Sequence, residues 1–209
     1  MPRNLPKKAK ISHEHGPIMP ARPELAVYIA RIATGWSGIE QAFGRLGIQL
    51  LGAHAHTGMK MYRALSGSAS RNAVLRAIAK DRLPENLMNE FEELMRATKK
   101  TAMKRNNVVH GMWELSDDLP NALVWHDSSD GLLNHGEFWG GWLSRSLEDR
   151  FKWALEERRV EPMHLVYEAK DFDEILDEMN LLMARLMTFT RECMKLNEPP
   201  SDETSLANA

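Results

Sequence analysis

The sequence predicts a mainly α-helical protein: an antiparallel helical bundle with a small β-hairpin or β insertion after the fourth helix. Apolar residues recur at helical spacing in three long segments, and a pattern typical of paired strands follows the second of them. Hydrophobic residues make up 43% and charged residues 27% of the chain, which is typical of a globular protein and excludes disorder throughout. A chain of 209 residues can bury one core without a metal or a disulfide.

The first long helix is expected to begin after Pro23. Apolar residues alternate at spacings of four and three along it, which places them on one face of a helix: Leu25, Ile29, Ile32, Trp36, Ile39, Phe43, Leu46 and Leu50. Shorter helices are expected at about 59–65 and 70–80.

The fourth helix is expected over 84–110, with Pro84 in its first turn and Gly111 as its C-cap. Its apolar stripe, continued toward the C-terminus, meets Arg105 and Asn106, so polar residues occupy the face expected to form a core or an interface. The final helix is expected over 171–196. Asp171 and Glu174 resemble a capping box at its start, and its buried seam is expected to include Ile175, Met179, Leu182, Leu186, Phe189 and Cys193.

Strands are expected between these two helices. Met112–Leu115 and Ala122–His126 flank a turn-forming segment and predict a hairpin with a long loop, and 163–168 predicts a further strand. A stretch rich in Gly and Trp at 131–142 and a helix at 146–158 are expected between them. We therefore predict a disordered arm at 1–20, a single helical domain at 21–196 with a β-containing insertion at about 111–170, and a disordered tail at 197–209.

Composition excludes several function classes. The net charge of −2 argues against a general electrostatic binder of nucleic acid or membrane. No segment has 18 successive apolar residues, so no transmembrane helix and no membrane partner are expected. The single cysteine, Cys193, cannot form an intrachain disulfide and suits a reducing compartment. We therefore expect a cytoplasmic protein, and we expect Cys193 to be a buried small hydrophobe.

The residues from Arg105 to His110 carry the strongest signal for chemistry. A histidine can transfer protons near neutral pH, an arginine can hold phosphate oxygens in two hydrogen bonds, and Asn106 can orient either group. These are the groups needed when RNA is cleaved by its own 2′-hydroxyl. Five residues turn an ideal helix by about 140°, so Arg105 and His110 are not expected to share one face. This spacing favours a site completed at a dimer interface.

The segment Arg105-Asn106-x3-His110-Gly111 resembles the motif of HEPN proteins, a family of helical-bundle proteins that includes many metal-independent ribonucleases. The family motif is an arginine, usually followed by a polar residue, and then a histidine. The resemblance covers this short motif, and Met112 stands where some members carry a tyrosine. It implies catalytic Arg105, Asn106 and His110, a homodimer, no cofactor, and an endoribonuclease with a toxin, antiphage or RNA-processing role. A cognate antitoxin or another regulatory protein is then an expected partner.

Other interpretations stand beside the ribonuclease. Residues 92–110 carry five Lys or Arg against two Glu. Lys99, Lys100 and Lys104 are therefore candidates for binding RNA phosphates, although cations at a helix C-terminus also complement the helix dipole. Arg105 and His110 are alternatively structural, with Arg105 paired to Glu40, in a non-catalytic dimeric scaffold that binds a partner through the Trp-rich insertion.

The His-x-His pairs at His13/His15 and His54/His56 are weak metal candidates, because positions i and i+2 of a helix point apart and no cysteine cluster is near. Acidic residues in turns, such as Asp117 and Asp118, are common for other reasons. No metal site is expected.

Overall fold

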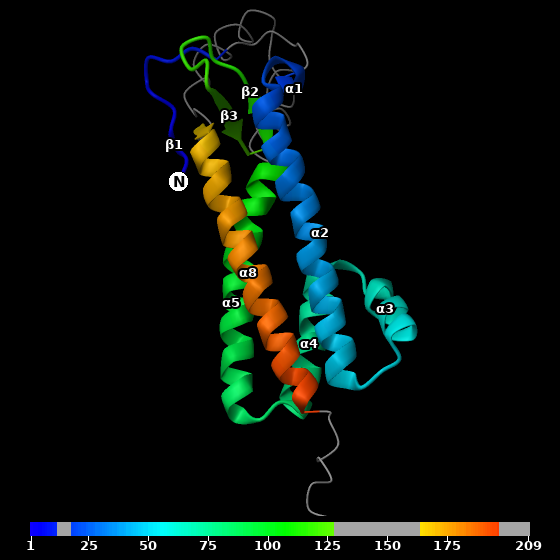
Figure 1. Cartoon of the computed structure of the whole chain (residues 1–209). Coiled ribbons are helices and arrows are strands. Elements are labelled where there is room, and N and C mark those ends of the chain that lie inside the picture. Colours follow the sequence, from blue (N-terminus) through cyan, green and yellow to red (C-terminus); the bar gives the residue numbers. More distant parts are fainter. Residues whose placement is uncertain (12–17, 128–163, 197–209) are drawn as a thin grey trace, which may run out of the picture. The chain divides into compact units, whose positions relative to one another are not determined.

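The computed structural model describes residues 1–11, 18–127 and 164–196 (Figure 1). Helices account for 73% of these residues and a small antiparallel sheet is added to them, which confirms the predicted fold class. The helices are α1 (Ile18–Ala21), α2 (Pro23–Leu51), α3 (Ala55–Ala64), α4 (Gly67–Arg82), α5 (Glu85–His110) and α8 (Ala169–Lys195). The strands are β1 (Arg3–Asn4), β2 (Met112–Glu114), β3 (Ala122–His126) and β4 (Leu165–Glu168).

The helix boundaries agree with the apolar spacing to within four residues, and the largest difference is at α3, which begins at Ala55 where 59 was predicted. The start of α8 also differs from the prediction. This helix begins at Ala169, and the carboxylate of Asp171 accepts the backbone N–H of Glu168 at 2.9 Å. Glu168 is therefore the N-cap residue, and Asp171 is the carboxylate that reaches back to it from the third helical position. The predicted capping box of Asp171 and Glu174 is wrong, because the residues at these two positions of the cap are Glu168 and Asp171, about one turn earlier.

The described chain divides into two compact units, where we predicted one helical domain over 21–196. Unit 1 comprises Met1–Thr34 and Ala102–Asp177, and unit 2 comprises Gly35–Thr101 and Glu178–Ala209. The helices α2, α5 and α8 each contribute residues to both units. The two units are described separately below.

Unit 1 contains the sheet, whose strand order is β1-β4-β3-β2 with every neighbouring pair antiparallel. The pairing of β2 with β3 confirms the predicted hairpin. All five residues of β3 are buried, because its apolar run has no polar face and it lies between β2 and β4. Arg3 and Asn4 pair with Val166 and Leu165 of β4, so the predicted disordered arm does not hold at these residues.

Aromatic rings fill the core of unit 1. Trp113 of β2 meets the edge of Tyr167 of β4 at a centroid distance of 5.2 Å, and Phe172 of α8 packs within 5.8 Å of both rings. Tyr28 of α2 stacks on Phe172 at a centroid distance of 5.7 Å. Aromatic rings thus connect the sheet with the helices of its unit.

Unit 2 is all-helical and has an aliphatic core with one aromatic pair, Phe91 of α5 and Phe189 of α8. In Figure 1 the unit 2 part of α5 runs opposite to those of α2 and α8. Gly47 lets α4 approach α2, since a Cβ there would lie 2.9 Å from Leu75. Cys193 is fully buried, which confirms its predicted role as a small hydrophobe, and burial raises the pKa of its thiol to about 11.

The predicted Trp-rich stretch at 131–142, the helix at 146–158 and the tail at 197–209 lie outside the described residues. Among the helices that are described, none combines the length and the apolar character that crossing a bilayer requires.

Candidate functional site

The end of α5 brings Arg105, Asn106 and His110 into contact within one chain. Nη1 of Arg105 donates to Oδ1 of Asn106 at 3.0 Å and lies 3.3 Å from Nε2 of His110. Asn106 and His110 are exposed and Arg105 is half-buried. The three polar groups therefore form one cluster that is open to solvent.

Arg105 and His110 lie five residues apart on α5 and do not share one face, as the spacing predicts, but the long side chain of Arg105 reaches His110 in the last turn of the helix. A second chain is not needed to bring them together. The alternative pairing of Arg105 with Glu40 is wrong, because Glu40 pairs with Arg71 within unit 2, at 3.9 Å.

The contact with Arg105 suits one tautomer of His110. A guanidinium has only donors, so the contact is a hydrogen bond in the tautomer that carries its proton on Nδ1 and offers Nε2 as the acceptor. An imidazole in this form offers a lone pair at the nitrogen that faces Arg105. Any negatively charged group that draws the guanidinium away would leave that nitrogen free to take a proton.

Two tryptophans hold the backbone beneath this cluster. The indole nitrogen of Trp125 donates to the carbonyl of Asn107 at 2.6 Å, and that of Trp113 donates to the carbonyl of Val108 at 3.2 Å. Both carbonyls belong to the last turn of α5, and that of Asn107 also accepts the backbone N–H of Gly111 at 3.0 Å. The strands β2 and β3 therefore anchor the end of α5 through hydrogen bonds that the spacing of the sequence did not reveal.

Gly111 follows α5 as predicted, but for a different reason. It is not among the described glycines with positive φ, so it is not a left-handed C-cap. A Cβ at Gly111 would overlap the indole ring of Trp125. Glycine is needed here because the ring of Trp125 must pass close to the backbone to reach Asn107.

The lysines predicted to bind RNA are distributed along α5. Lys99 and Lys100 are exposed and belong to unit 2, whereas Lys104 is half-buried and belongs to unit 1. No described contact joins them to Arg105, Asn106 or His110, so their role in binding RNA stays a prediction.

A second polar cluster in unit 1 was not predicted. Nε2 of His126 and Nε2 of His164 lie 3.7 and 3.5 Å from the two carboxylate oxygens of Glu114, and the two imidazole rings are 5.6 Å apart. All three side chains are largely buried, with 11–24% of each exposed. All three residues lie in strands that the sequence predicts. The cluster could have been predicted only with the strand order and register, which place His126 beside His164.

Metal-binding geometry is absent from the described ranges, where no group of three or more His, Cys, Asp or Glu side chains could hold an ion. His54 and His56 are exposed at the start of α3. His13 and His15 lie outside the described residues.

The chain was compared with models of known protein families, with curated proteins and with solved structures, and no match was found in any of the three.

Proposed function

We propose that this protein is a metal-independent endoribonuclease similar in its motif to HEPN proteins, with Arg105, Asn106 and His110 as its catalytic residues. The observation that carries the proposal is the shared contact of one guanidinium nitrogen with Asn106 and His110 at an exposed helix end. A phosphate-binding cation and a proton acceptor lie side by side there, and RNA can reach both.

The chemistry assigns one step to each residue. Nε2 of His110 takes the proton of a ribose 2′-hydroxyl, whose oxygen attacks the adjacent phosphorus. Arg105 turns its N–H donors to the non-bridging phosphate oxygens and stabilises their growing charge. The bond from phosphorus to the 5′-oxygen breaks, and that oxygen receives the proton from His110. The products are a 2′,3′-cyclic phosphate and a 5′-hydroxyl, and His110 returns to its starting form.

Asn106 positions Arg105 in this scheme. Its side-chain oxygen accepts from Nη1, so the guanidinium is held over the last turn of α5 before substrate arrives. Lys99, Lys100 and Lys104 would contact flanking RNA phosphates. A cytoplasmic location, a homodimer, a toxin, antiphage or RNA-processing role and a cognate antitoxin or other regulatory partner belong to the same proposal and rest on the resemblance of the motif.

Cleavage of a 5′-labelled RNA in excess EDTA tests this proposal. We expect His110→Ala to lower the cleavage rate by about 10²- to 10⁴-fold, because general acid–base catalysis contributes about that much. His56→Ala is the matched control, since it removes another exposed histidine outside the cluster. RNA with a 2′-deoxy substitution at the cleavage position should resist wild-type protein.

A structural role for the cluster gives a different pattern. If wild type and His110→Ala show the same background cleavage, and His110→Ala lowers the melting temperature, Arg105 and His110 serve to close the end of α5. The non-catalytic scaffold would then replace the ribonuclease as the explanation. Cleavage of the 2′-deoxy substrate would likewise contradict the proposed chemistry.

A further inference from the structure

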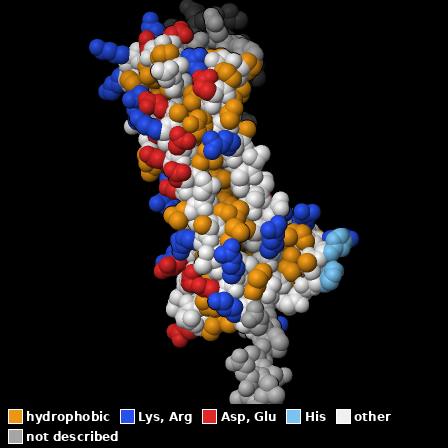
Figure 2. All heavy atoms as spheres, viewed as in Figure 1, with side chains coloured by type: hydrophobic (Ala, Val, Ile, Leu, Met, Phe, Trp, Pro, Cys, Tyr) orange, Lys and Arg blue, Asp and Glu red, His pale blue; other side chains and the backbone are white. Residues whose placement is uncertain are grey.

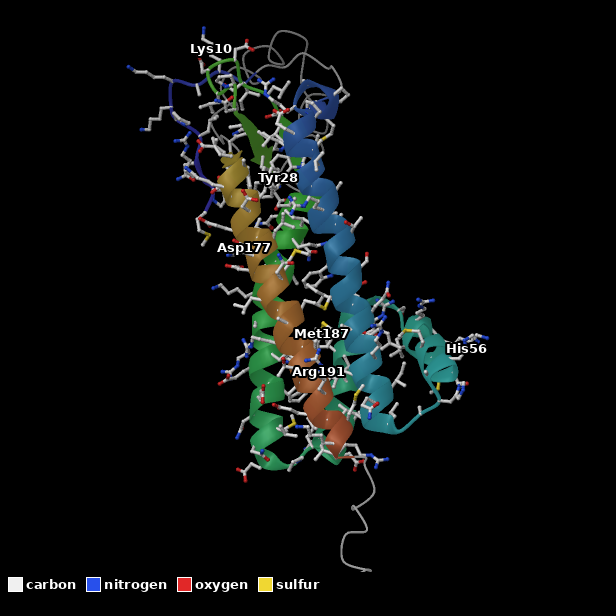
Figure 3. All side chains as sticks on the ribbon, viewed as in Figure 1. Lys10, Tyr28, His56, Asp177, Met187 and Arg191 are labelled. Carbon is white, nitrogen blue, oxygen red and sulfur yellow. The ribbon has the colours of Figure 1, made fainter. Side chains whose placement is uncertain are left out.

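Unit 2 contains a cavity with a volume of about 450 Å³, which is within the range of small-molecule sites. Residues of α2, α3 and α8 line it, and most of them are apolar. They include three methionines, Met59, Met187 and Met194. Figure 3 labels Met187 and Arg191 on successive turns of α8, on the side turned toward α2.

The cavity wall is built by close packing of α3 on α2. A Cβ at Gly58 would lie 2.6 Å from Ile48, and one at Gly44 would lie 2.9 Å from Tyr62. Glycines at these positions let the side chains of Ile48 and Tyr62 pack directly on the backbone of the neighbouring helix. The cavity wall is therefore held by close contact between two elements of one unit.

Two arginines, Arg45 of α2 and Arg191 of α8, add positive charge to the lining. Both are exposed, and neither has a hydrogen bond or ion pair with another described residue. No Asp or Glu lines the cavity. Figure 2 shows Lys and Arg atoms in blue beside hydrophobic atoms in orange on this face, near the pale-blue histidines.

Thr190, a polar residue of the lining, cannot replace the arginines. Its hydroxyl donates to the carbonyl of Leu186 at 2.7 Å, so its hydrogen is already used within α8. The exposed fractions of Met187 and Met194 are 49% and 46%, and these side chains present flexible thioethers to whatever enters. The cavity thus combines an adaptable apolar surface with two guanidinium groups that lack a carboxylate.

We propose that this cavity binds an anionic amphiphile, a carboxylate on an acyl chain of medium length. The chain would lie against the methionines and Ile48, and the carboxylate would take paired hydrogen bonds from Arg45 and Arg191. This inference is independent of the proposed ribonuclease, since every residue that carries it belongs to unit 2 and none belongs to the cluster at His110.

Calorimetric titration with decanoate tests the site, with the full chain and ligand kept below its micelle concentration. We expect one decanoate per chain, and weaker binding of decanol, decyltrimethylammonium and acetate. Arg191→Gln should weaken decanoate binding at least about tenfold, as expected for the loss of hydrogen bonds between charged groups. Arg63→Gln, which changes an exposed arginine of α3 outside the cavity, should not.

Methyl NMR of the methionines locates the bound ligand without a substitution. Signals of Met59, Met187 and Met194 should shift on titration, while those of Met103 and Met112, which belong to unit 1 and do not line the cavity, should not. The proposal fails if these three signals stay in place, if decanol binds as tightly as decanoate, or if Arg63→Gln matches Arg191→Gln. It fails equally if a second copy of the chain covers the cavity, seen as a concentration-dependent mass that Met187→Lys abolishes.

Discussion

Unit 1 holds histidines in two clusters that differ in partner and in exposure. His110 is exposed and faces the guanidinium of Arg105, whereas His126 and His164 are largely buried and face the carboxylate of Glu114. A guanidinium has only donors, whereas the carboxylate of Glu114 can only accept. Nε2 of His110 therefore faces a donor, and Nε2 of His126 and of His164 faces an acceptor. Nδ1 of His126 also lies 3.3 Å from an acceptor, the carbonyl of Asp127.

This difference indicates which cluster takes part in cleavage and which one stabilises the fold. A proton acceptor beside an exposed cation is useful only if a charged substrate arrives and displaces that cation. The second cluster is enclosed within unit 1, and Oε2 of Glu114 has no hydrogen-bond partner among the described residues, so these side chains are less accessible to a substrate than His110. We therefore expect substitutions in the first cluster to change cleavage, and those in the second to change the free energy of unfolding.

The largest effect should come from replacing the guanidinium beside His110 with a carboxylate, which is the group that His126 and His164 face. Arg105→Glu places a carboxylate at the phosphate site, and we expect the cleavage rate to fall about 10³-fold, since both the cation and the accepting form of His110 are lost. The melting temperature should change little. Single-turnover cleavage and thermal unfolding of the same sample measure both quantities.

The matched change in the buried cluster is Glu114→Gln. It should leave cleavage intact and lower the free energy of unfolding by about 1–2 kcal/mol, because it removes the carboxylate charge beside two largely buried imidazoles. The roles assigned to the two clusters are wrong if Glu114→Gln abolishes cleavage while Arg105→Glu retains it, because the catalytic histidine would then be His126 or His164.

A second substitution tests whether the sheet supports the exposed cluster. Gly111→Ala forces a methyl group into the indole of Trp125, whose nitrogen binds the carbonyl of Asn107. We expect a loss of about 3 kcal/mol in the free energy of unfolding and a lower cleavage rate. Gly38→Ala is the control, because its Cβ meets only the flexible end of Met183, at 3.3 Å. Equal stability of the two variants would show that Trp125 does not hold this end of α5.

The helices could be predicted from the sequence because their signal is local. The seam of α8 is buried at every predicted position, including Phe189 and Cys193, since residues three and four apart must share a face. The contact between Arg105 and His110 could not be predicted from spacing, because it depends on the rotamer of a long side chain. The cluster at Glu114 depends on strand order and register, which join residues up to 50 positions apart (164 − 114).

The smallest effect concerns Tyr167 of β4, another buried titratable side chain. Burial raises the pKa of Tyr167 from 10.0 to about 12, with a smaller contribution from the charge of Asp171. The unfolded chain releases this proton first, so between pH 10 and 12 the folded state holds more protons and stability falls as pH rises. The loss attributable to Tyr167 should be about 1 kcal/mol by pH 11 and absent at pH 7.

Tyr167→Phe isolates this contribution, because it keeps the ring that packs on Trp113 and removes the titrating hydroxyl. Urea unfolding at pH 7 and pH 11 should show a smaller difference for the variant than for wild type. A residual decline is expected in part from Cys193 in unit 2, whose pKa is raised to about 11 by burial, and Cys193→Ala should reduce it. An unchanged decline in Tyr167→Phe would mean that the hydroxyl ionises alike in the folded and unfolded chains. Tyr167 would then contribute nothing to the pH dependence of the free energy of unfolding. The proposed role of the exposed cluster at His110 would be unaffected.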